Sequence, residues 1–410
     1  MTFKRHALVW SAIFLFIVGF TLHIHQLFAM SATMVALPLL ARLLGRGKLR
    51  GLMTRRRVSK AAVAGERVKV DLEVYNTART RKIFFIATET LGRLRPSQVD
   101  LPVAILGPGD HTTLSYEVRP PRRGVYPIGP TTLWTPDVIG LNYYRRELPQ
   151  VNELIVYPQA AMLPYLWPSA EGGRQPIKPR RRLRGEGDDL YGVRDYQPGD
   201  DPRRISWKTT ARRGKLAVVE YERPESLEGV IILDLDRRWH AGEGDRHTLE
   251  YAVTIAATLI EQAYERGSTV GLIVKGEQDW SCAPLPETEQ RLRLFEALAR
   301  VQPWVQDPLT QIVAANERLI PPGATVAVLS PSPDAGDLGA HLRGLGHAVT
   351  WFLLDSGSFG GGRVDYAPLE SMLLGSRCHL RRIQGDRPLE ANWRRGGTAR
   401  AAGGGSHATG

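Results

Sequence analysis

The sequence predicts a membrane-anchored multidomain protein with a transmembrane helical hairpin at the N-terminus, an antiparallel β-sandwich of the immunoglobulin-like class, and a mostly parallel α/β domain. Three observations support this prediction. Residues 6–41 contain no Lys, Arg, Asp or Glu, residues 66–157 contain strands of alternating polarity, and residues 228–354 alternate apolar runs with amphipathic helices. A chain of 410 residues has room for two or three domains.

The basic charge of the chain is concentrated in two segments. The formal net charge is +12. Residues 1–57 hold nine Lys or Arg and no acidic residue, while residues 174–215 hold thirteen basic and six acidic residues. The remainder is slightly acidic, so a general polyanion-binding surface is not indicated and we expect no nucleic-acid partner. Only Cys282 and Cys378 occur, which favours a reducing compartment and excludes a disulfide framework.

The apolar stretch near the N-terminus is longer than one helix needs to cross a hydrocarbon layer of about 30 Å. Its most polar part is residues 23–26, so we expect two short spans at about 7–22 and 27–44, with residues 1–50 forming the hairpin and its basic flank. The positive-inside rule places the basic residues on both sides of the hairpin, and hence the folded domains, in the cytoplasm. The alternatives are a cleaved signal peptide, or one tilted helix with the domains outside.

Residues 55–160 are predicted to form the β-sandwich. Residues 66–74 alternate Val and Leu with charged residues, which is the period of a half-buried strand. Further strands are expected at 82–89, 112–118, 131–134 and 153–157, separated by turns rich in Gly and Pro. Five aromatic residues are expected to pack in the core or across strands, and not to form a ligand-stacking surface: Tyr75, Phe84, Phe85, Tyr116 and Trp134.

Residues 228–392 are predicted to form the α/β domain, after a Pro-rich and Arg-rich connector at 161–184. The apolar run at 230–233 suits a strand buried on both faces, and residues 248–266 have helical spacing with Gly267 as a stop. Strands at 268–274, 324–329 and 348–354 alternate with helices at 288–301 and 337–344, which predicts a parallel sheet covered on both faces. The Gly-rich tail at 393–410 is expected to be disordered.

A polar and regular segment at 185–222 lies between these domains. Residues 198–202 have the composition of a tight turn, which is followed by a short helix. Ile205 and Trp207 are expected to anchor that helix to a core, while Arg203, Arg204, Lys208 and Arg212 face elsewhere.

The segment contains Arg194-Asp195-Tyr196-Gln197-Pro198-Gly199-Asp200-Asp201-Pro202-Arg203-Arg204-Ile205, followed by Trp207-Lys208, Ala211-Arg212, Gly214-Lys215-Leu216 and Glu220. With these residues it resembles the bacterial family known as domain of unknown function 58. The resemblance implies a C-terminal domain similar to the von Willebrand factor A fold, a multi-pass protein of the bacterial inner membrane, and a MoxR-type AAA+ ATPase as partner. It also implies an accessory or assembly role and no reaction.

Mixed charge of this kind forms an ion-pair network or an interaction surface more often than a catalytic centre, so no catalytic residue is predicted. The predicted signature and interaction residues are Arg194, Asp195, Tyr196, Pro198, Gly199, Asp200, Asp201, Arg203, Arg204, Trp207, Lys208 and Arg212.

Domains of the von Willebrand A type often bind Mg²⁺ through Asp-x-Ser-x-Ser after the first strand. This chain has Asp234-Leu235-Asp236-Arg237-Arg238, which keeps the first Asp and loses both Ser. Because an arginine opposes a divalent cation, no cofactor is predicted. Asp234 and Asp236, with Asp355 or Ser330 at later strand ends, remain the candidates for Mg²⁺, and the alternative is that they cap loops or pair with the arginines. His240 and His247 are expected to be solvated.

The sequence thus predicts a membrane-anchored, non-enzymatic scaffold or adaptor that binds lipid and a protein partner. Two rival functions stay open. The first is a metal-dependent hydrolase or phosphoryl-transfer enzyme that uses Asp200, Asp201 and Asp234. The second is nucleic-acid binding by the basic connector at 174–184.

Overall fold

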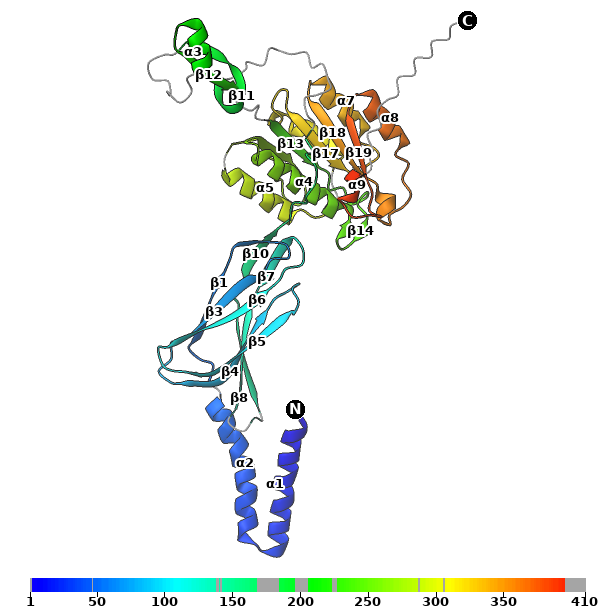
Figure 1. Cartoon of the computed structure of the whole chain (residues 1–410). Helices are drawn as coiled ribbons and strands as arrows, with labels where there is room; N and C mark the ends of the chain where they lie inside the picture. Colours follow the sequence, from blue (N-terminus) through cyan, green and yellow to red (C-terminus); the bar gives the residue numbers. More distant parts are fainter. Residues whose placement is uncertain are drawn as a thin grey trace. The chain divides into compact units, whose positions relative to one another are not determined.

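The computed structural model describes residues 2–45, 47–137, 140, 142–167, 184–195, 206–222, 227–286, 288–304 and 307–394. The chain divides into two compact units, Met1–Gln159 and Ala160–Gly410 (Figure 1). The first unit holds two helices and the β-rich domain, and the second holds the α/β domain. Of the tail expected to be disordered, residues 393–394 instead end a short helix, and residues 395–410 lie outside the described range.

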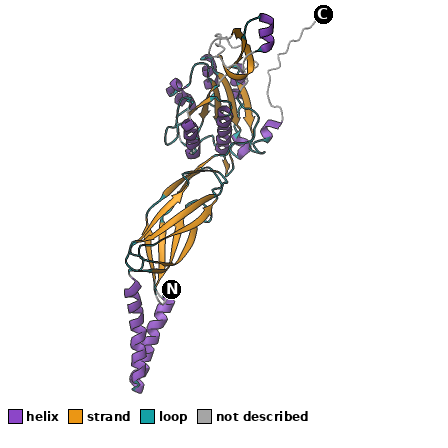
Figure 2. Cartoon of the chain, turned by 60° about the vertical axis from the view of Figure 1, so that its left-hand side comes forward, coloured by secondary structure: helices purple, strands orange, loops and turns teal. Residues whose placement is uncertain are grey.

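Two helices, α1 (Thr2–Leu22) and α2 (His25–Gly45), lie antiparallel and side by side (Figures 1 and 2). The Ser31 hydroxyl of α2 donates a hydrogen bond of 2.9 Å to the Ala12 carbonyl of α1. Near the turn, the rings of Phe16 and Phe28 meet edge to face at 5.4 Å. By length and composition, His25–Leu43 can cross a membrane, while the apolar part of α1, His6–Leu22, is shorter.

The β-rich domain contains three sheets. The first is ordered β1 (Leu52–Val58), β3 (Val68–Asn76), β6 (His111–Val118). The second is ordered β2 (Ala61–Val63), β10 (Asn152–Tyr157), β7 (Gly124–Ile128). The third is ordered β5 (Gln98–Leu106), β4 (Lys82–Thr90), β8 (Thr131–Pro136), β9 (Tyr143–Leu148). All pairs are antiparallel except β2 with β10, and the five predicted strands are confirmed.

Alternating side chains of these strands fill two apolar clusters. One cluster includes Val70, Leu91, Tyr116, Ile128 and Leu154. The other includes Leu52, Leu72, Val74, Phe85 and Leu133. Since strand side chains alternate between faces, the inward positions of each strand are apolar and form the core.

The packing predicted for Phe84 is wrong. Its side chain is 69% exposed, because its backbone has a φ of 48° that interrupts the regular alternation of β4. By contrast, Tyr75 stacks on His111 of the neighbouring strand at 5.4 Å, as expected for cross-strand packing.

A buried ion pair lies between the sheets of this domain. The Arg56 guanidinium binds both carboxylate oxygens of Glu89, at 2.7 and 3.0 Å, and the two side chains are 1% and 0% exposed. Arg56 also donates to Asn152 Oδ1 at 2.7 Å, and Tyr116 donates to Glu89 at 3.0 Å. The remaining partners of the pair are the Thr131 hydroxyl and the Gln150 carbonyl. Every charge here therefore has hydrogen-bond partners, which a buried pair requires.

The second unit is built on a five-stranded parallel sheet. Its order is β16 (Thr269–Ile273), β13 (Glu228–Leu233), β17 (Thr325–Ser330), β18 (Ala348–Leu354), β19 (His379–Ile383). The main helices are α4 (Thr248–Tyr264), α5 (Thr288–Arg300), α6 (Leu309–Ala315), α7 (Gly336–Gly344) and α8 (Ala367–Gly375). They lie on both faces of the sheet (Figures 1 and 2), so the predicted α/β domain with a parallel sheet is confirmed.

The first residues of the expected connector pack on the α/β domain. Trp167 is buried, its indole N–H donates to the Leu259 carbonyl of α4 at 2.9 Å, and its ring lies against Gly229. A Cβ at Gly229 would come within 2.6 Å of that ring, so only glycine allows the contact. Leu166 and Trp167 therefore belong to the core of this unit, and residues 168–183 lie outside the described range.

The segment of the predicted signature forms a small hairpin with a helix. Strand β11 (Arg184–Asp195) pairs antiparallel with β12 (Ala217–Glu222), and α3 (Trp207–Arg213) lies between them in sequence. Ser206 caps α3 at its start, and Gly214 ends it with a φ of 68°. Short elements complete the unit: β14 (Gly242–Glu243), β15 (Arg246–His247), and α9 (Ala391–Arg394).

Candidate functional site

The polar residues of the second unit meet at the carboxyl edge of its parallel sheet. Asp234 and Asp236 follow β13, Ser330 ends β17, and Asp355 follows β18. Since β13, β17 and β18 are adjacent and parallel, these residues come to the same edge, where open α/β sheets bind their ligands.

Asp234 is buried at the centre of this edge. Its Oδ2 accepts a hydrogen bond of 2.6 Å from the Ser330 hydroxyl, and its Oδ1 accepts one of 3.0 Å from the Asp236 amide. Burial raises the pKa of Asp234, although these hydrogen bonds oppose the rise. Asp234 and Ser330, two of the candidates for Mg²⁺, thus lie in direct contact, and both carboxylate oxygens of Asp234 have hydrogen-bond partners.

Asp236 is held by Arg238. The arginine side chain reaches both carboxylate oxygens, with its shortest contact at 2.6 Å, and its amide donates a further bond at 3.0 Å. Burial alone would raise the pKa of Asp236, but the hydrogen bonds and charge of Arg238 bring it below its ordinary value. The expected pairing of Asp236 with an arginine of its own loop is thus observed.

The expectation that His240 is solvated is wrong. Its Nε2 lies 2.9 Å from the Asp234 carbonyl, and its Nδ1 lies 2.8 Å from the Thr248 hydroxyl at the start of α4. The ring of His240 also stacks on that of His247, whose Nδ1 accepts from the Leu249 amide. Burial lowers the pKa of His240 to about 4, so the imidazole is neutral and links the loop after β13 to α4.

We expect this histidine to make stability depend on pH. In an unfolded chain its pKa is about 6.5, so between pH 6.5 and about 4 the unfolded state binds more protons than the folded state. Stability contributed by His240 is therefore lost as the pH falls through that window. Because His240→Gln removes this linkage, urea unfolding of both proteins should show the advantage of the wild type shrinking towards pH 4. Parallel curves of unfolding free energy against pH would contradict this.

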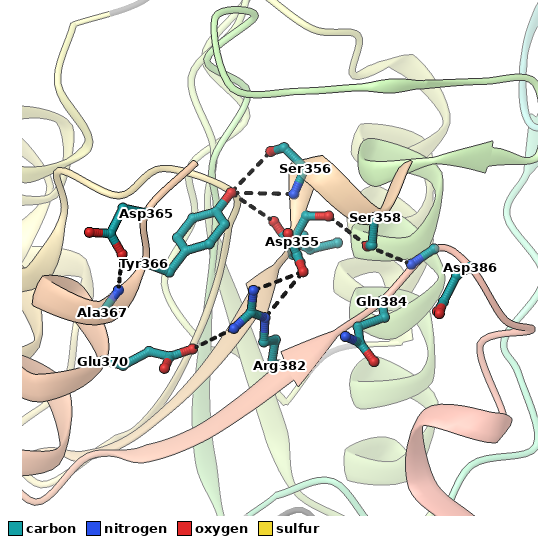
Figure 3. Close-up of polar contacts among 12 residues, drawn as sticks. Asp355, Ser356, Ser358, Asp365, Tyr366, Ala367, Glu370, Arg382, Gln384 and Asp386 are labelled. Carbon is teal, nitrogen blue, oxygen red and sulfur yellow. Dashed lines mark hydrogen bonds and ion pairs between the residues drawn. The ribbon is translucent and has the colours of Figure 1, made fainter. Parts of the chain in front are cut away.

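An open cleft of about 910 Å³ lies beside β18 and β19 at the same edge. Figure 3 shows Arg382 of β19 between two carboxylates, with contacts of 2.9 Å to Asp355 and 3.3 Å to Glu370 of α8. Tyr366 donates its hydroxyl proton to the Pro331 carbonyl at 2.9 Å and accepts from the Ser356 amide. Arg363 is exposed on the rim. Among these cleft residues only Asp355 was predicted from the sequence. The others belong to no sequence motif, and only the fold brings them together.

Part of the chain matches a known family model. Residues 192–330 match the protein of unknown function DUF58. The match begins within β11 and ends at the last residue of β17, so it includes Asp234, Asp236 and Ser330 but not Asp355 or Arg382.

Comparisons with other proteins add little to the DUF58 match. The chain is 25% identical over 221 residues to the uncharacterized protein YeaD of Bacillus subtilis, and it spans about half the length of that relative. Among solved structures it is similar to the CARDB domain of the PF1109 protein of Pyrococcus furiosus, with 14% identity, a TM-score of 0.20, and coverage of 26% of this chain and 91% of that one. A cohesin module of Clostridium perfringens is also similar, with 14% identity, a TM-score of 0.20, and coverage of 26% of this chain and 98% of that one. No inference about function follows from similarity this low.

The predicted signature is only partly described. Arg194 and Asp195 end β11, where their backbones pair with Val218 and Ala217. Lys208 and the exposed Arg212 belong to α3. Outside the described residues lie Tyr196, Pro198, Gly199, Asp200, Asp201, Arg203 and Arg204, together with Ile205.

The core anchor predicted at Trp207 is wrong. Trp207 is 68% exposed at the first position of α3. In the hairpin of β11 and β12, Ala217 and Val218 of β12 are buried instead.

The described residues at the sheet edge do not fit a Mg²⁺ site. Magnesium needs carboxylate oxygens that are free to coordinate, together with several waters. Here Arg238 covers Asp236, Arg382 covers Asp355, and Asp234 is engaged by Ser330 and a backbone amide. In the described part of the chain, no three His, Cys, Asp or Glu side chains are grouped to hold a metal.

Proposed function

We propose that this chain is a DUF58-type, non-enzymatic scaffold or adaptor, anchored in the bacterial inner membrane, whose α/β domain binds a protein partner at the carboxyl edge of its sheet. The observation that carries the proposal is the Arg238–Asp236 pair, with a contact of 2.6 Å at the position where a related metal-binding loop would hold its ion. Because the positive charge of Arg238 opposes a divalent cation and binds the carboxylate of Asp236, this arrangement favours binding of a protein partner over metal-dependent catalysis.

The electrostatics of the edge support binding. The carboxylates of Asp236 and Asp355 are each matched by an arginine and that of Asp234 by a hydroxyl, so these three are neither free bases nor free metal ligands. Arg238 and Arg382 keep part of their guanidinium groups exposed while they bind these carboxylates. Arginine is enriched in protein interfaces, where its fixed donors bind carboxylates and carbonyls. The open cleft beside Arg382 offers such donors together with Asp355 and Glu370.

The rest of the proposed architecture follows from the N-terminal unit. We infer a hairpin of α1 and α2 that crosses the membrane twice, an immunoglobulin-like sandwich, and a von Willebrand A-like domain in the cytoplasm. It is supported by one helix that is long and apolar enough to span a bilayer, and by the basic residues that flank both helices. Protease added outside intact cells should leave the folded domains whole.

The partner we propose is a MoxR-type AAA+ ATPase, as the family resemblance implies. We expect full-length protein, purified from detergent-solubilised membranes, to retain such an ATPase, and Arg363→Glu to reduce the retained amount about tenfold because it reverses a charge on the cleft rim. Quantitative mass spectrometry of the eluate measures the effect.

The matched control is Arg318→Glu. Arg318 is exposed and lies in the 3-10 helix Glu317–Leu319, before β17 and so at the opposite edge of the sheet. This variant should retain the ATPase as the wild type does. Repeated absence of any such ATPase, or equal loss in both variants, would refute the proposed site.

The rival metal-dependent enzyme makes a different prediction. It requires Mg²⁺ or Mn²⁺ to bind with a calorimetric signal that Asp234→Ala abolishes. With the carboxylates engaged as described, we expect no heat from either ion.

A further inference from the structure

We propose that the end of the β-sandwich nearest α2 lies in the headgroup region of the bilayer and binds anionic lipid there. This inference rests on the membrane anchoring proposed above and adds a second contact with the membrane. The surface consists of exposed residues at one end of the domain: Arg50, Met53, Arg79, Arg81, Ile83, Phe84, Ile105 and Tyr143. We refer to it as the helix-proximal surface.

This end of the sandwich is fixed to the end of α2. The segment that leaves the helix is held to the sheets by four hydrogen bonds from side chains. They are Tyr144 Oη to the Arg42 carbonyl at 3.0 Å, Lys82 Nζ to the Gly47 carbonyl at 3.4 Å, Lys48 Nζ to the Pro136 carbonyl at 2.9 Å, and Arg146 Nη1 to the Leu49 carbonyl at 2.8 Å. If α2 crosses a membrane, the strand ends bonded in this way stand at its surface.

Large apolar side chains are exposed at the same strand ends. Ile83 and Phe84 follow Lys82 in β4, and Ile105 pairs with Ile83 from β5. Tyr143 pairs with Pro136 at the start of β9, and Met53 is the second residue of β1. Exposed apolar patches on soluble domains usually mark an interaction surface, and aromatic residues favour the membrane interface.

Phe84 is presented outward by an unusual backbone conformation. Its φ of 48° lies in the left-handed region, which is unfavourable for a bulky residue. The Thr135 hydroxyl stabilises this conformation through a hydrogen bond of 2.9 Å to the Phe84 carbonyl. Phe85 packs in the core, so the two neighbouring rings face opposite environments. The left-handed backbone at Phe84 costs conformational energy, and the exposed ring gains no packing energy within the folded chain. This combination favours an interaction of the ring with a ligand outside the chain.

The charge around these side chains fits an anionic lipid surface. Residues 42–54, which run from the end of α2 into the start of β1, contain four Lys or Arg and no acidic residue. Arg79 and Arg81 are exposed in the loop that follows β3, and this loop is held to the same end by a 2.7 Å bond from the Thr77 amide to the Gly51 carbonyl. Asp110 is an acidic residue at this end, through its contact with Asn76. Each basic residue near an anionic bilayer contributes about 1 kcal/mol of attraction.

Continuity with α2 favours lipid over a protein as the occupant. The chain between the helix and β1 is short and bonded to the sheets, so a bilayer around α2 reaches the helix-proximal surface without any rearrangement. A protein partner would have to enter the space between the domain and the membrane.

The test uses the full-length chain in nanodiscs that contain anionic lipid. Cys282 and Cys378 are replaced by alanine, and an environment-sensitive fluorophore is attached to Phe84→Cys or, as a second position, Ile105→Cys. Two control labels are placed at Leu37→Cys near the middle of α2 and at Ser59→Cys, about 20 Å further along the direction of β1. Quenching is measured with lipids that carry a nitroxide on the headgroup or on the acyl chain.

We expect headgroup nitroxide to remove most of the emission at positions 84 and 105, and little at 59, while acyl-chain nitroxide quenches position 37. Replacing Arg79 and Arg81 together by Glu, or omitting anionic lipid, should weaken quenching at 84 and leave it unchanged at 37. If the label at position 37 is quenched while the labels at positions 84 and 105 are quenched as little as the label at position 59, the lipid contact of the helix-proximal surface is wrong. The proposed membrane anchoring by α2 would then be retained. An unquenched label at 37 would overturn both.

Discussion

Arg56→Ala is expected to destabilise the β-rich domain by about 3–5 kcal/mol, because it leaves the Glu89 carboxylate buried without its counter-charge. Glu89 accepts two bonds from Arg56, one from Tyr116 and one from Thr131, and the loss of the guanidinium leaves only the neutral donors. Hydrogen exchange of β4 and β8, followed by mass spectrometry across a urea series, measures the loss in this domain alone.

The neighbouring residue provides the control. Arg57 lies on the same strand and pairs with Glu73 at 2.9 Å, but its side chain is 65% exposed. Arg57→Ala should therefore cost at most about 1 kcal/mol. A double variant, Arg56→Met with Glu89→Leu, should be less destabilised than Arg56→Ala, because it removes both buried charges. Equal effects of the two single alanine variants would show that the buried pair has no special role.

Trp167→Ala should destabilise the α/β unit by about 3–5 kcal/mol, since it removes a large buried side chain that packs on Gly229 and α4. Trp167→Phe keeps an aromatic ring and loses the bond to the Leu259 carbonyl, so its cost should be about 1 kcal/mol. Hydrogen exchange of β13 and α4 reports the stability of this unit.

Trp304→Ala serves as the control of equal size. Trp304 is exposed over a large part of its surface. Its backbone amide donates a hydrogen bond to the Leu235 carbonyl, and its carbonyl accepts one from the Arg237 amide, so these bonds do not depend on the side chain. The substitution should cost clearly less than Trp167→Ala. A loss for Trp167→Ala no larger than about 1 kcal/mol, or no larger than that for Trp304→Ala, would contradict the core role assigned to Trp167.

Periodicity predicted β3, β4, β6, β8 and β10 of the β-rich domain and missed its other strands, two of which carry several charged residues. The sequence of β9, Tyr-Tyr-Arg-Arg-Glu-Leu, has no buried position, and β1 contains three consecutive arginines. These segments are strands because they pair with β8 and β3 at the edges of their sheets. Pairing of this kind is a tertiary effect that a local pattern does not contain.

Contacts in the candidate site could be predicted only where the order of the parallel strands brings two residues to the same edge of the sheet. Parallel strands bring their carboxyl ends together, so the meeting of Asp234 with Ser330 followed from the strand assignment. The ion pair of Arg382 with Asp355 needed the position of β19, a strand that has two arginines and that periodicity did not detect. Exposure of Phe84 and Trp207 could not be foreseen either, because the residue types alone favour burial.

Strand β16 forms one border of the parallel sheet, and a short segment around Cys282 covers it. The Leu272 amide donates to the Cys282 carbonyl at 2.9 Å, and the Cys282 amide donates to the Leu272 carbonyl at 2.8 Å. Gly271 allows this approach, since a Cβ there would lie 2.7 Å from the Cys282 oxygen. The outward main-chain groups of Leu272 are therefore already satisfied, and copies of this chain have less opportunity to aggregate by joining their sheets at that point.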